Sequence, residues 1–600
     1  MNANTFSKVE KNILLFLGVA LFTYIALRAV LVPIVHDEAA TYFYYIQTHN
    51  WLPYQAHWDA NNHLINSALS SFYVDFLGTD VWVLRLGSLL FLPLYLIYTY
   101  RISSLLQNKY LRWGLVFSLW FAHYFIEFLG YSRGYGMSMA LVVASLYYTI
   151  CFIQNIGTKY LLYALVFNVL SLAANLSLLN SFLLINGILF LICVANFKQV
   201  SKLIVGGFFI LLSIIPGLFF VRYLFEMKTR GLLYYGSEKG FIEVTLKSVT
   251  RLIVGVENTY IIGFIIVLFI ALLIAYVVPK IKQLKSIEPV DVFVAMLVGN
   301  VVIILLLGMI LHVNYPEDRV GMYLYLFLAL AVFFVADAIK HKARYLLVLP
   351  FLYFPTQFGF AANITHSKLW YEEHISERFF NKVATYRCIG ECYPPVVSGY
   401  SMRLLVWSYY NQQKNAKQNE LEYVGYENNL LSDYIISRKN EIIGWEQYYT
   451  EVDFDTISGL SLLERNNFVE EQLLYTSPTS NFDKQSNEYF NFLEINTDTL
   501  AGKNIRINVD GLVKLYSDSL LNGRIIVSLT DSVNTDYGTY NTQLSWQQQK
   551  QPNGEYKIKY SYLIPNISPK VSRIIIYYWN IDKQKVSLLN AKATIFEVIY

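Results

Sequence analysis

Charged residues are scarce in this chain. They make up 15% of its 600 residues, whereas 55% of the residues are hydrophobic and 16% are aromatic. Soluble domains carry about 25% charged residues, so this composition excludes an ordinary soluble protein and indicates a membrane protein. The formal net charge is only +4 and no basic tract is present. The sequence therefore does not predict nucleic acid as a partner.

Cysteine is also scarce, with four residues in the whole chain, which excludes a disulfide-stabilised scaffold. Cys151 and Cys193 lie in apolar runs, where a thiol usually acts as a small buried hydrophobe. Cys388 and Cys392 are the only close pair. Two cysteines without a further His or Cys cluster make a poor zinc site, so a local disulfide is the alternative if this segment is extracytoplasmic.

Long apolar runs are abundant. A run of about 17–25 apolar residues can cross a bilayer as a helix, and about eleven such runs are present. They cover residues 13–32, 81–100, 111–129, 135–154, 160–178, 181–197, 203–221, 260–278, 292–312, 320–339 and 345–361. The sequence therefore predicts a polytopic α-helical membrane domain over residues 1–361.

The distribution of lysine and arginine predicts the orientation of these helices. Positive charges favour cytoplasmic loops, and no Lys or Arg occurs between Arg28 and Arg85. We therefore expect the first loop, residues 33–80, to lie outside a bacterial cytoplasmic (inner) membrane. The N-terminus is then cytoplasmic, and a second large loop at 222–259 and everything after residue 362 are extracytoplasmic.

The first outer loop contains an apolar helical pattern. Within residues 64–77, apolar residues recur on one helical face and Asn66, Ser67, Ser70 and Asp75 lie off it. This segment is too polar to cross a membrane, so it predicts a helix lying in the membrane interface. Residues 42–46 indicate a second, shorter helix.

After residue 362 the composition changes to that of a soluble protein. Residues 362–480 alternate strand-like and helix-like pieces, which predicts a small α/β segment. Residues 481–600 contain short strand-like runs separated by Asn, Asp, Gly and Pro, which predicts an antiparallel, jelly-roll-like β-sandwich.

Asp37 and Glu38, in "VPIVHDEAATYF", directly follow the first apolar run. One interpretation is that Asp37 caps a short interfacial helix and Glu38 lies favourably in its first turn. The functional interpretation is a general base, because a carboxylate partly removed from water accepts a hydroxyl proton more readily. Both interpretations can hold together.

The stretch "HWDANNHLINS" places His57, Asp59, Asn62 and His63 in the same outer loop. His, Asp and His could bind a metal ion, but their spacing matches no known ligand motif. A polar loop entering an amphipathic helix explains the stretch equally well, so a divalent metal is left open and no cofactor is predicted.

Two arginines begin apolar runs on the outer side. Arg133 lies in "EFLGYSRGYG" with Glu127, and an arginine at a helix end can simply extend to the lipid headgroups. Arg319 follows Asp318 in "HVNYPEDRVGMYLYL". Positively charged residues favour the cytoplasmic side, so an arginine on the outer side indicates an anionic partner or a pairing with Asp318. Arginines and a carboxylate pair on one face suit transfer of a group from a lipid phosphate.

These residues carry a family resemblance. The chain resembles the GT-C superfamily of membrane glycosyltransferases, which includes protein O-mannosyltransferases and the aminoarabinose transferase acting on lipid A. The shared features are the Asp-Glu pair after the first span, the interfacial outer loop, "VLRLGSLLF", "YSRGYGMSMAL" and "YPEDRVGMYLYL". The resemblance covers residues 1–361.

The resemblance implies that Asp37 is the catalytic base supported by Glu38, and that Arg133 and Arg319 bind the donor phosphate. The implied reaction moves one sugar from a polyprenyl-phosphate carrier to a glycan, lipid or protein acceptor, with inversion. "NNHLINS" departs from the His-Pro segment of many members, and the roles of Asn62 and His63 are therefore open.

Two other functions compete with this one. An oligosaccharyltransferase or ligase would use a pyrophosphate-linked glycan, and that chemistry usually needs more carboxylates around a metal. A transporter of lipid-linked sugars would place its charges near the bilayer midplane, whereas those of this chain cluster at the outer boundary. The β-sandwich either binds sugar or packs against the rest of the chain.

Overall fold

The computed structural model describes residues 6–196, 200–281, 287–339, 342, 344–385, 393–423, 430–466, 469–497 and 499–599. The predicted Cys388–Cys392 pair lies outside these residues. The chain divides into two compact units, one of residues 1–33 and 44–369 and one of residues 34–43 and 370–600. We call them the membrane unit and the C-terminal unit.

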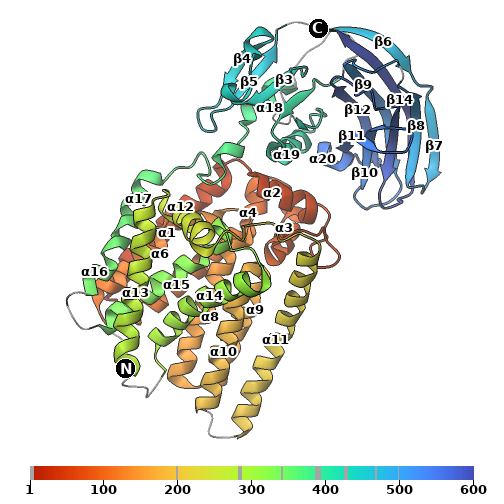
Figure 1. Ribbon diagram of the computed structural model, residues 1–600. Helices are drawn as coiled ribbons and strands as arrows, with labels where there is room; N and C mark the ends of the chain where they lie inside the picture. Colours follow the sequence, from red (N-terminus) through yellow and green to blue (C-terminus); the bar gives the residue numbers. More distant parts are fainter. Residues whose placement is uncertain are drawn as a thin grey trace. The chain divides into compact units, whose positions relative to one another are not determined.

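The membrane unit is helical throughout (Figure 1). Its α-helices are α1 (Lys8–Leu31), α3 (Leu64–Leu77), α4 (Val81–Leu89), α5 (Phe91–Ser103), α6 (Lys109–Trp120), α7 (His123–Ile126), α8 (Gly134–Asn155), α9 (Thr158–Ala174), α10 (Leu179–Asn196), α11 (Val200–Thr229), α12 (Lys247–Val254), α13 (Thr259–Ile281), α14 (Pro289–Leu311), α15 (Tyr323–Ala338), α16 (Arg344–Val348) and α17 (Tyr353–Ala361). Short 3₁₀ turns are η2 (Glu127–Gly130), η3 (Leu176–Leu178), η5 (Asp318–Gly321) and η6 (Leu349–Leu352), and π-turns are η1 (Tyr42–Ile46, which enters the unit at Tyr44) and η4 (Ile242–Leu246).

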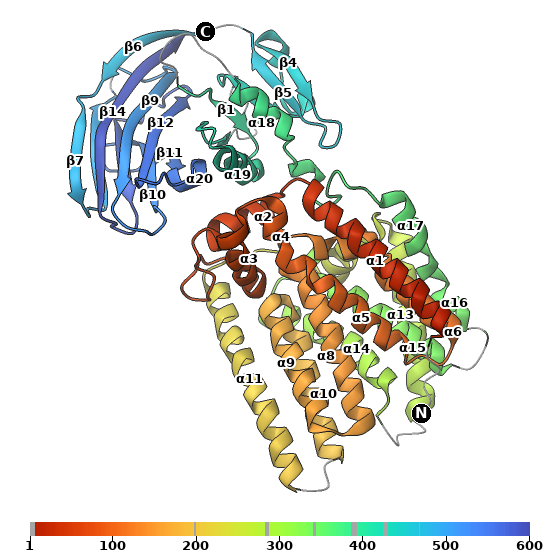
Figure 2. The same cartoon turned by 180° about the vertical axis from the view of Figure 1, so that it is seen from behind.

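Within the described residues, eight helices are long and apolar enough to cross a membrane, so the chain is a multi-pass membrane protein. A ninth candidate is the pair 109–120 and 123–130, which bends by 58°. The predicted spans at 160–178 and 345–361 correspond to α9 and to the broken run α16–η6–α17, which are shorter. Figure 2 shows α1 on the surface of the bundle, beside α5.

Contacts at both ends of the run α16–η6–α17 indicate how far it extends along the bundle. Near the end of α1, Arg28 Nη1 lies 3.1 Å from Asn363 Oδ1, just after α17. At the opposite end of the bundle, just after α5, Asn108 Nδ2 donates to the Tyr345 hydroxyl on α16 at 2.9 Å. The run α16–α17 therefore extends from one end of the bundle to the other. These contacts agree with about eleven crossings, and that count stays a prediction.

The helix expected in the first outer loop is α3, and its amphipathic character is unusual. Its buried side chains are polar: Asn66, Ser67, Ser70 and Ser71. Its exposed side chains include Phe72, at 58%, and Phe76, at 72%. A helix that turns its polar face to the protein and its aromatic face outward suits a lipid surface.

The C-terminal unit begins with the predicted α/β segment. A five-stranded sheet in the order β2-β1-β3-β5-β4 contains β1 (Val397–Gly399), β2 (Glu422–Tyr423), β3 (Tyr434–Ser437), β4 (Tyr449–Phe454) and β5 (Ser461–Arg465). Strand β1 pairs in parallel with β2 and β3, and the other pairs are antiparallel. The helices of this unit are α2 (His36–Thr41), α18 (Glu377–Ala384), α19 (Leu404–Lys414) and α20 (Leu544–Gln547), with 3₁₀ turns η7 (Tyr371–Glu373), η8 (Ser401–Arg403), η9 (Lys439–Glu441) and η10 (Trp445–Gln447).

The predicted antiparallel β-sandwich is confirmed and begins earlier than expected. One sheet has the order β11-β10-β13-β8 and the other β12-β9-β14-β6, with β7 also on β14. The strands are β6 (Glu470–Thr476), β7 (Ser480–Gln485), β8 (Tyr489–Asn496), β9 (Ile505–Leu515), β10 (Gly523–Thr530), β11 (Asp536–Gln543), β12 (Glu555–Ile564), β13 (Arg573–Asn580) and β14 (Val586–Ile599). The expected start at residue 481 is wrong because β6 pairs with β14. That pairing is non-local, so the sequence pattern around β6 could not reveal it.

The α/β segment covers the free edge of β12. Asn419 Oδ1 accepts the backbone N–H of Ser561 at 2.9 Å, and Glu422 Oε1 accepts that of Leu563 at 3.1 Å. Ser561 and Leu563 are two residues apart on β12, so both N–H groups point to the same side, away from β9. Side-chain oxygens therefore satisfy an exposed strand edge, which is otherwise prone to pair with other chains.

Two carboxyl groups in this seam make the stability of the C-terminal unit pH-dependent. Burial raises the pKa of Glu420 and of Glu422 to about 8 each, although Arg524 and the Leu563 N–H oppose the rise. The folded state therefore holds more protons than the unfolded state between about pH 4.5 and 8, so the free energy of unfolding falls as pH rises through this range. We expect the melting temperature of the C-terminal unit to decrease from pH 5 to pH 9. In the double variant Glu420→Gln/Glu422→Gln the slope should be smaller, and an unchanged slope would contradict the assignment.

Candidate functional site

Asp37 and Glu38 lie in the short helix α2, within the segment 34–43 that belongs to the C-terminal unit. Both side chains are buried. Glu38 Oε2 accepts the Val35 N–H at 3.2 Å, and the Thr41 hydroxyl donates to the Asp37 carbonyl at 2.9 Å. Glu38 therefore contributes a side-chain bond at the start of the helix, and Val35 is the residue at the cap position. The expectation that Asp37 is the cap is wrong.

Aromatic and amide contacts hold the segment 34–43 in its unit. The Tyr42 hydroxyl donates to Gln412 Oε1 on α19 at 2.7 Å, and its ring meets the ring of Tyr409 at a centroid distance of 5.5 Å. Phe43 contacts Trp546 on α20 at 5.1 Å. Asp37 thus lies on a short helix that packs on α19, and Phe43, which follows that helix, contacts α20.

In the membrane unit, Arg85 holds the chain at the point where it leaves α1 for this segment. The Arg85 side chain is fully buried, and Nη1 donates to the carbonyls of Val32 at 2.6 Å and Ala29 at 3.2 Å. Nη2 donates to Pro33 at 2.9 Å. A guanidinium placed on the last carbonyls of a helix satisfies acceptors that the helix leaves open. Arg85 therefore fixes the chain four residues before Asp37.

Arg133 is buried by protein and does not extend to the headgroups, so that alternative is wrong. Its side chain is 0% exposed, and its Nη2 donates to Asn61 Oδ1. The Ser132 hydroxyl next to it accepts from Asn66 Nδ2 on α3 at 3.2 Å. The start of α8 is thus bound to the loop that carries Asp59. The companion Glu127 pairs instead with Arg28 of α1, at 2.9 Å.

The four predicted loop residues divide into two pairs. Asn62 and His63 are buried: Asn62 Nδ2 donates to the Trp51 carbonyl at 2.9 Å, and His63 Nδ1 lies 3.1 Å from the Ala174 carbonyl. Gly134 makes this packing possible, because a Cβ there would lie 1.9 Å from the Ala174 carbonyl oxygen. Asn62 and His63 therefore hold the loop in place.

His57 and Asp59 are the more accessible pair. The His57 ring stacks on Tyr44 at a centroid distance of 4.3 Å. Asp59 Oδ1 accepts the Asn61 N–H at 2.8 Å, and both Asp59 oxygens lie 3.5 Å from the Tyr234 hydroxyl in the second outer loop. The structure thus brings the two outer loops together at Asp59.

Two tyrosines connect Asp59 to Arg319. The rings of Tyr234 and Tyr235 stack with centroids 4.7 Å apart. The guanidinium carbon of Arg319 lies 5.2 Å from the centre of the Tyr235 ring, and Nη2 donates to the Tyr235 hydroxyl at 3.4 Å. The sequence pattern did not identify Tyr234 or Tyr235. The adjacent "YY" in an outer loop was the available signal.

The second outer loop is anchored next to Arg319. Ser237 forms a β-bridge with Tyr315, and the Tyr315 N–H donates to the Ser237 carbonyl at 3.0 Å. Gly236 allows this approach: its φ is +82°, and a Cβ there would lie 2.0 Å from the Tyr315 carbonyl oxygen.

Asp318 pairs with an arginine that sequence analysis did not single out. Arg251 Nη2 on α12 lies 3.2 Å from both Asp318 oxygens, and Asp318 raises the pKa of Arg251. The expected pairing of Asp318 with Arg319 is therefore replaced by one with Arg251. The Asp318 N–H also donates to the Ser248 hydroxyl on α12 at 2.7 Å, so α12 holds the turn that bears Arg319.

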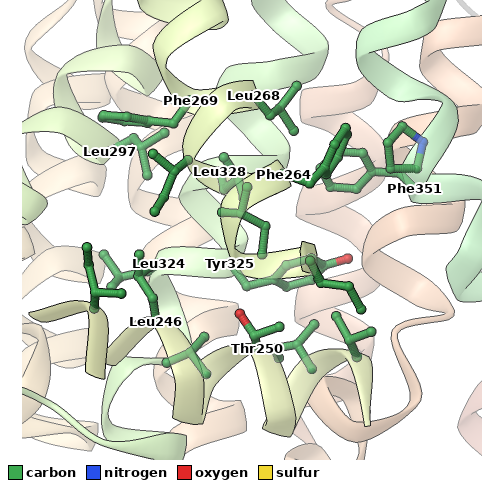
Figure 3. Close-up of a pocket in the computed structure, with 18 of the residues that line it drawn as sticks. Leu246, Thr250, Phe264, Leu268, Phe269, Leu297, Leu324, Tyr325, Leu328 and Phe351 are labelled. Carbon is green, nitrogen blue, oxygen red and sulfur yellow. The ribbon is translucent and has the colours of Figure 1, made fainter. Parts of the chain in front are cut away.

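An apolar cavity of about 610 Å³ lies beside α12 (Figure 3). Its walls come from η4, α12, α13, α14, α15, η6 and the start of α17. Figure 3 labels Leu246, Thr250, Phe264, Leu268, Phe269, Leu297, Leu324, Tyr325, Leu328 and Phe351. The lining is almost entirely hydrocarbon. Such a cavity suits an acyl or isoprenoid chain, because a polar ligand would lose its hydrogen bonds to water there.

In the described part of the chain, no group of three or more His, Cys, Asp or Glu side chains lies close enough to hold a metal ion.

No protein-family model and no curated protein sequence matches the chain. Several solved structures are similar to it at low TM-score, including the following three. The arabinosyltransferase EmbB from Mycobacterium smegmatis is 10% identical, with a TM-score of 0.37, over 97% of this chain and 64% of that one. ArnT from Cupriavidus metallidurans is 10% identical, with a TM-score of 0.35, over 76% of this chain and 98% of that one. The archaeal oligosaccharyltransferase AglB from Archaeoglobus fulgidus, solved with an inhibitory peptide and a dolichol-phosphate, is 9% identical, with a TM-score of 0.37, over 92% of this chain and 94% of that one. This chain spans less than two thirds of the length of EmbB.

Proposed function

We propose that the chain is a membrane glycosyltransferase that moves a sugar from a polyprenyl-phosphate donor to an acceptor hydroxyl on the extracytoplasmic face. One observation carries the proposal. The helix α12 both lines an apolar cavity of about 610 Å³ and, through Arg251 and Asp318, holds the turn that bears Arg319. A lipid phosphate needs an apolar space for its chain and a cation for its headgroup, and here the two are adjacent.

The arginines have distinct roles in this proposal. Arg319, stacked on Tyr235, binds the donor phosphate and stabilises the charge that develops on it as the sugar leaves. Arg133 is a second candidate for that phosphate, and its bond to Asn61 holds its position. Arg251 acts indirectly, because its partner Asp318 precedes Arg319 in the same turn.

Asp37 is the proposed base. It takes the proton of the acceptor hydroxyl while the acceptor oxygen bonds to the anomeric carbon. The bond from that carbon to the phosphate oxygen breaks in the same step, and the polyprenyl phosphate leaves with the electron pair. A single displacement of this kind inverts the anomeric centre. Glu38 supports Asp37 by holding the first turn of α2 through Val35. Asp59 and His57 are candidates for contacts with the sugar.

The test is transfer of label from a polyprenyl-phosphate sugar by purified protein in lipid nanodiscs. Arg319→Ala should raise the KM for the donor roughly 10- to 100-fold, because a hydrogen bond to a charged group is worth about 1.5–3 kcal/mol. Arg319→Lys keeps the charge but not the fork geometry and should recover part of the loss. The matched control is Arg222→Ala, since Arg222 is 79% exposed and pairs only with Glu226 in its own helix among the described contacts.

Three outcomes decide the proposal. An Arg319→Ala variant with wild-type donor KM would remove Arg319 from the site. Transfer from a pyrophosphate-linked oligosaccharide, with none from the monophosphate sugar, would establish the ligase alternative. Movement of intact lipid-linked sugar across the bilayer without transfer would establish the transporter alternative.

A further inference from the structure

The outer face of the four-stranded sheet carries three neighbouring aromatic side chains. Trp579 on β13 is paired in register with Tyr489 on β8, and Tyr577 lies two residues before Trp579. The rings of Tyr489 and Trp579 are 6.3 Å apart and within 17° of parallel, and Tyr577 meets Tyr489 edge-on at 5.8 Å. We call these three residues the aromatic platform.

The platform is not part of the sandwich core. Strand alternation directs Ile576 and Tyr578 into the core, which leaves Tyr577 and Trp579 on the opposite face. Tyr489 is 52% exposed. Large aromatic residues on an outer sheet face cost solubility unless they serve contact with a ligand or partner.

Amide groups border the platform. Asn491 on β8 is paired in register with Tyr577, and Asn541 on β11 lies on the same face beyond Ile526. Both asparagine side chains are exposed. An amide both donates and accepts hydrogen bonds, as does a sugar hydroxyl.

Charges of both signs lie around the platform, and four of them form two ion pairs. Lys583 Nζ lies 3.2 Å from Glu488, and Arg573 Nη1 lies 3.3 Å from Glu494. One further charge of each sign is present: Arg524, whose Nε donates to the neutral Gln543 Oε1 at 2.7 Å, and Asp536. Burial and the charge of Asp536 raise the pKa of Tyr577. The platform therefore offers no excess of either sign, which favours a neutral ligand over a phosphate, a nucleic acid or an acidic glycan.

We propose that the aromatic platform binds a neutral glycan. The C–H face of a sugar ring is apolar and lies flat on an aromatic ring, while its hydroxyl groups at the rim reach amide groups such as those of Asn491 and Asn541. Trp and Tyr provide such contact area at a low entropy cost because each has only two side-chain torsions. This site shares no residue with the proposed transfer reaction, whose residues lie in the membrane unit and in α2.

The experiment uses the full chain in nanodiscs and isothermal titration with mannohexaose, cellohexaose and arabinohexaose, with heparin hexasaccharide as the acidic probe. At least one neutral hexasaccharide should bind, and Trp579→Ala or Tyr489→Ala should weaken that binding about tenfold or more, a change of about 1.4 kcal/mol. The control is Tyr475→Ala on β6 of the other sheet, where Tyr475 is 39% exposed. It should bind as the wild type does. Circular dichroism checks the fold of each variant.

Absence of binding by all three neutral hexasaccharides at millimolar concentration overturns the proposal. So does binding that Trp579→Ala and Tyr489→Ala leave unchanged, tighter binding of heparin hexasaccharide, or self-association of the chain that Trp579→Ala abolishes. Asp37→Asn separates this site from the transfer reaction, because that variant should keep glycan affinity whether or not it transfers sugar.

Discussion

Replacing Asp37 with asparagine should lower the rate of sugar transfer by about 10²- to 10⁴-fold, the range that a positioned general base contributes. Asparagine has nearly the same shape but cannot accept a proton from the acceptor hydroxyl. The local fold should survive, because Thr41 bonds to the backbone carbonyl of Asp37 and Glu38 holds the first turn. The measurement is single-turnover release of label from a saturating polyprenyl-phosphate sugar.

Two variants in the first outer loop sharpen this prediction. Glu38→Gln keeps an acceptor for the Val35 N–H and should reduce transfer much less than Asp37→Asn does. Asp75→Asn changes an exposed carboxylate of the same outer loop, 51% exposed, and should have no effect. Wild-type turnover by Asp37→Asn would remove Asp37 from the chemistry. An equal loss in Glu38→Gln would indicate that the shape of α2, and not one proton acceptor, limits the reaction.

The features that sequence analysis predicted well are those set by local pattern. Apolar runs of membrane length gave the long spans, because hydrocarbon solvation acts on each segment separately. The recurrence of apolar residues on one helical face predicted α3, and Phe72 and Phe76 on that face are exposed. The strand-like runs after residue 481 gave the sandwich. In each case the physical signal lies within about twenty residues of chain.

What the sequence could not reveal depends on contacts between distant residues. Arg319 and Asp59 are 260 positions apart, and only the fold shows that Tyr234 and Tyr235 connect them. Asp318 pairs with the distant Arg251 although Arg319 is its direct neighbour in the sequence. The same holds for Glu127, which lies near Arg133 in the chain but pairs with Arg28. Charge pairing in a helical bundle is decided by which helix ends meet, and sequence spacing does not encode that.

Breaking the buried Arg28–Glu127 pair by removing one partner should strongly destabilise the membrane unit. Both side chains are only 3% exposed, and Glu127 also accepts from Tyr131 at 3.2 Å and lies 3.2 Å from His123. Removing one member leaves the other charge buried without compensation, which costs about 3–5 kcal/mol. Glu127→Leu should therefore lower the free energy of unfolding by about that amount, measured by reversible denaturation in mixed micelles.

The double variant tests whether the loss comes from the orphaned charge. Removing both charges abolishes the desolvation penalty together with the attraction, so Arg28→Leu/Glu127→Leu should be more stable than Glu127→Leu alone. Part of the loss should remain, because Arg28 also donates to the His366 carbonyl at 3.1 Å and ties α1 to the chain after α17. Glu238→Leu, at an exposed glutamate of the second outer loop, is the control and should change stability by less than about 0.5 kcal/mol. If Glu127→Leu changes the free energy of unfolding as little as Glu238→Leu does, water reaches the Arg28 guanidinium, and the pair is not a buried contact between α1 and η2.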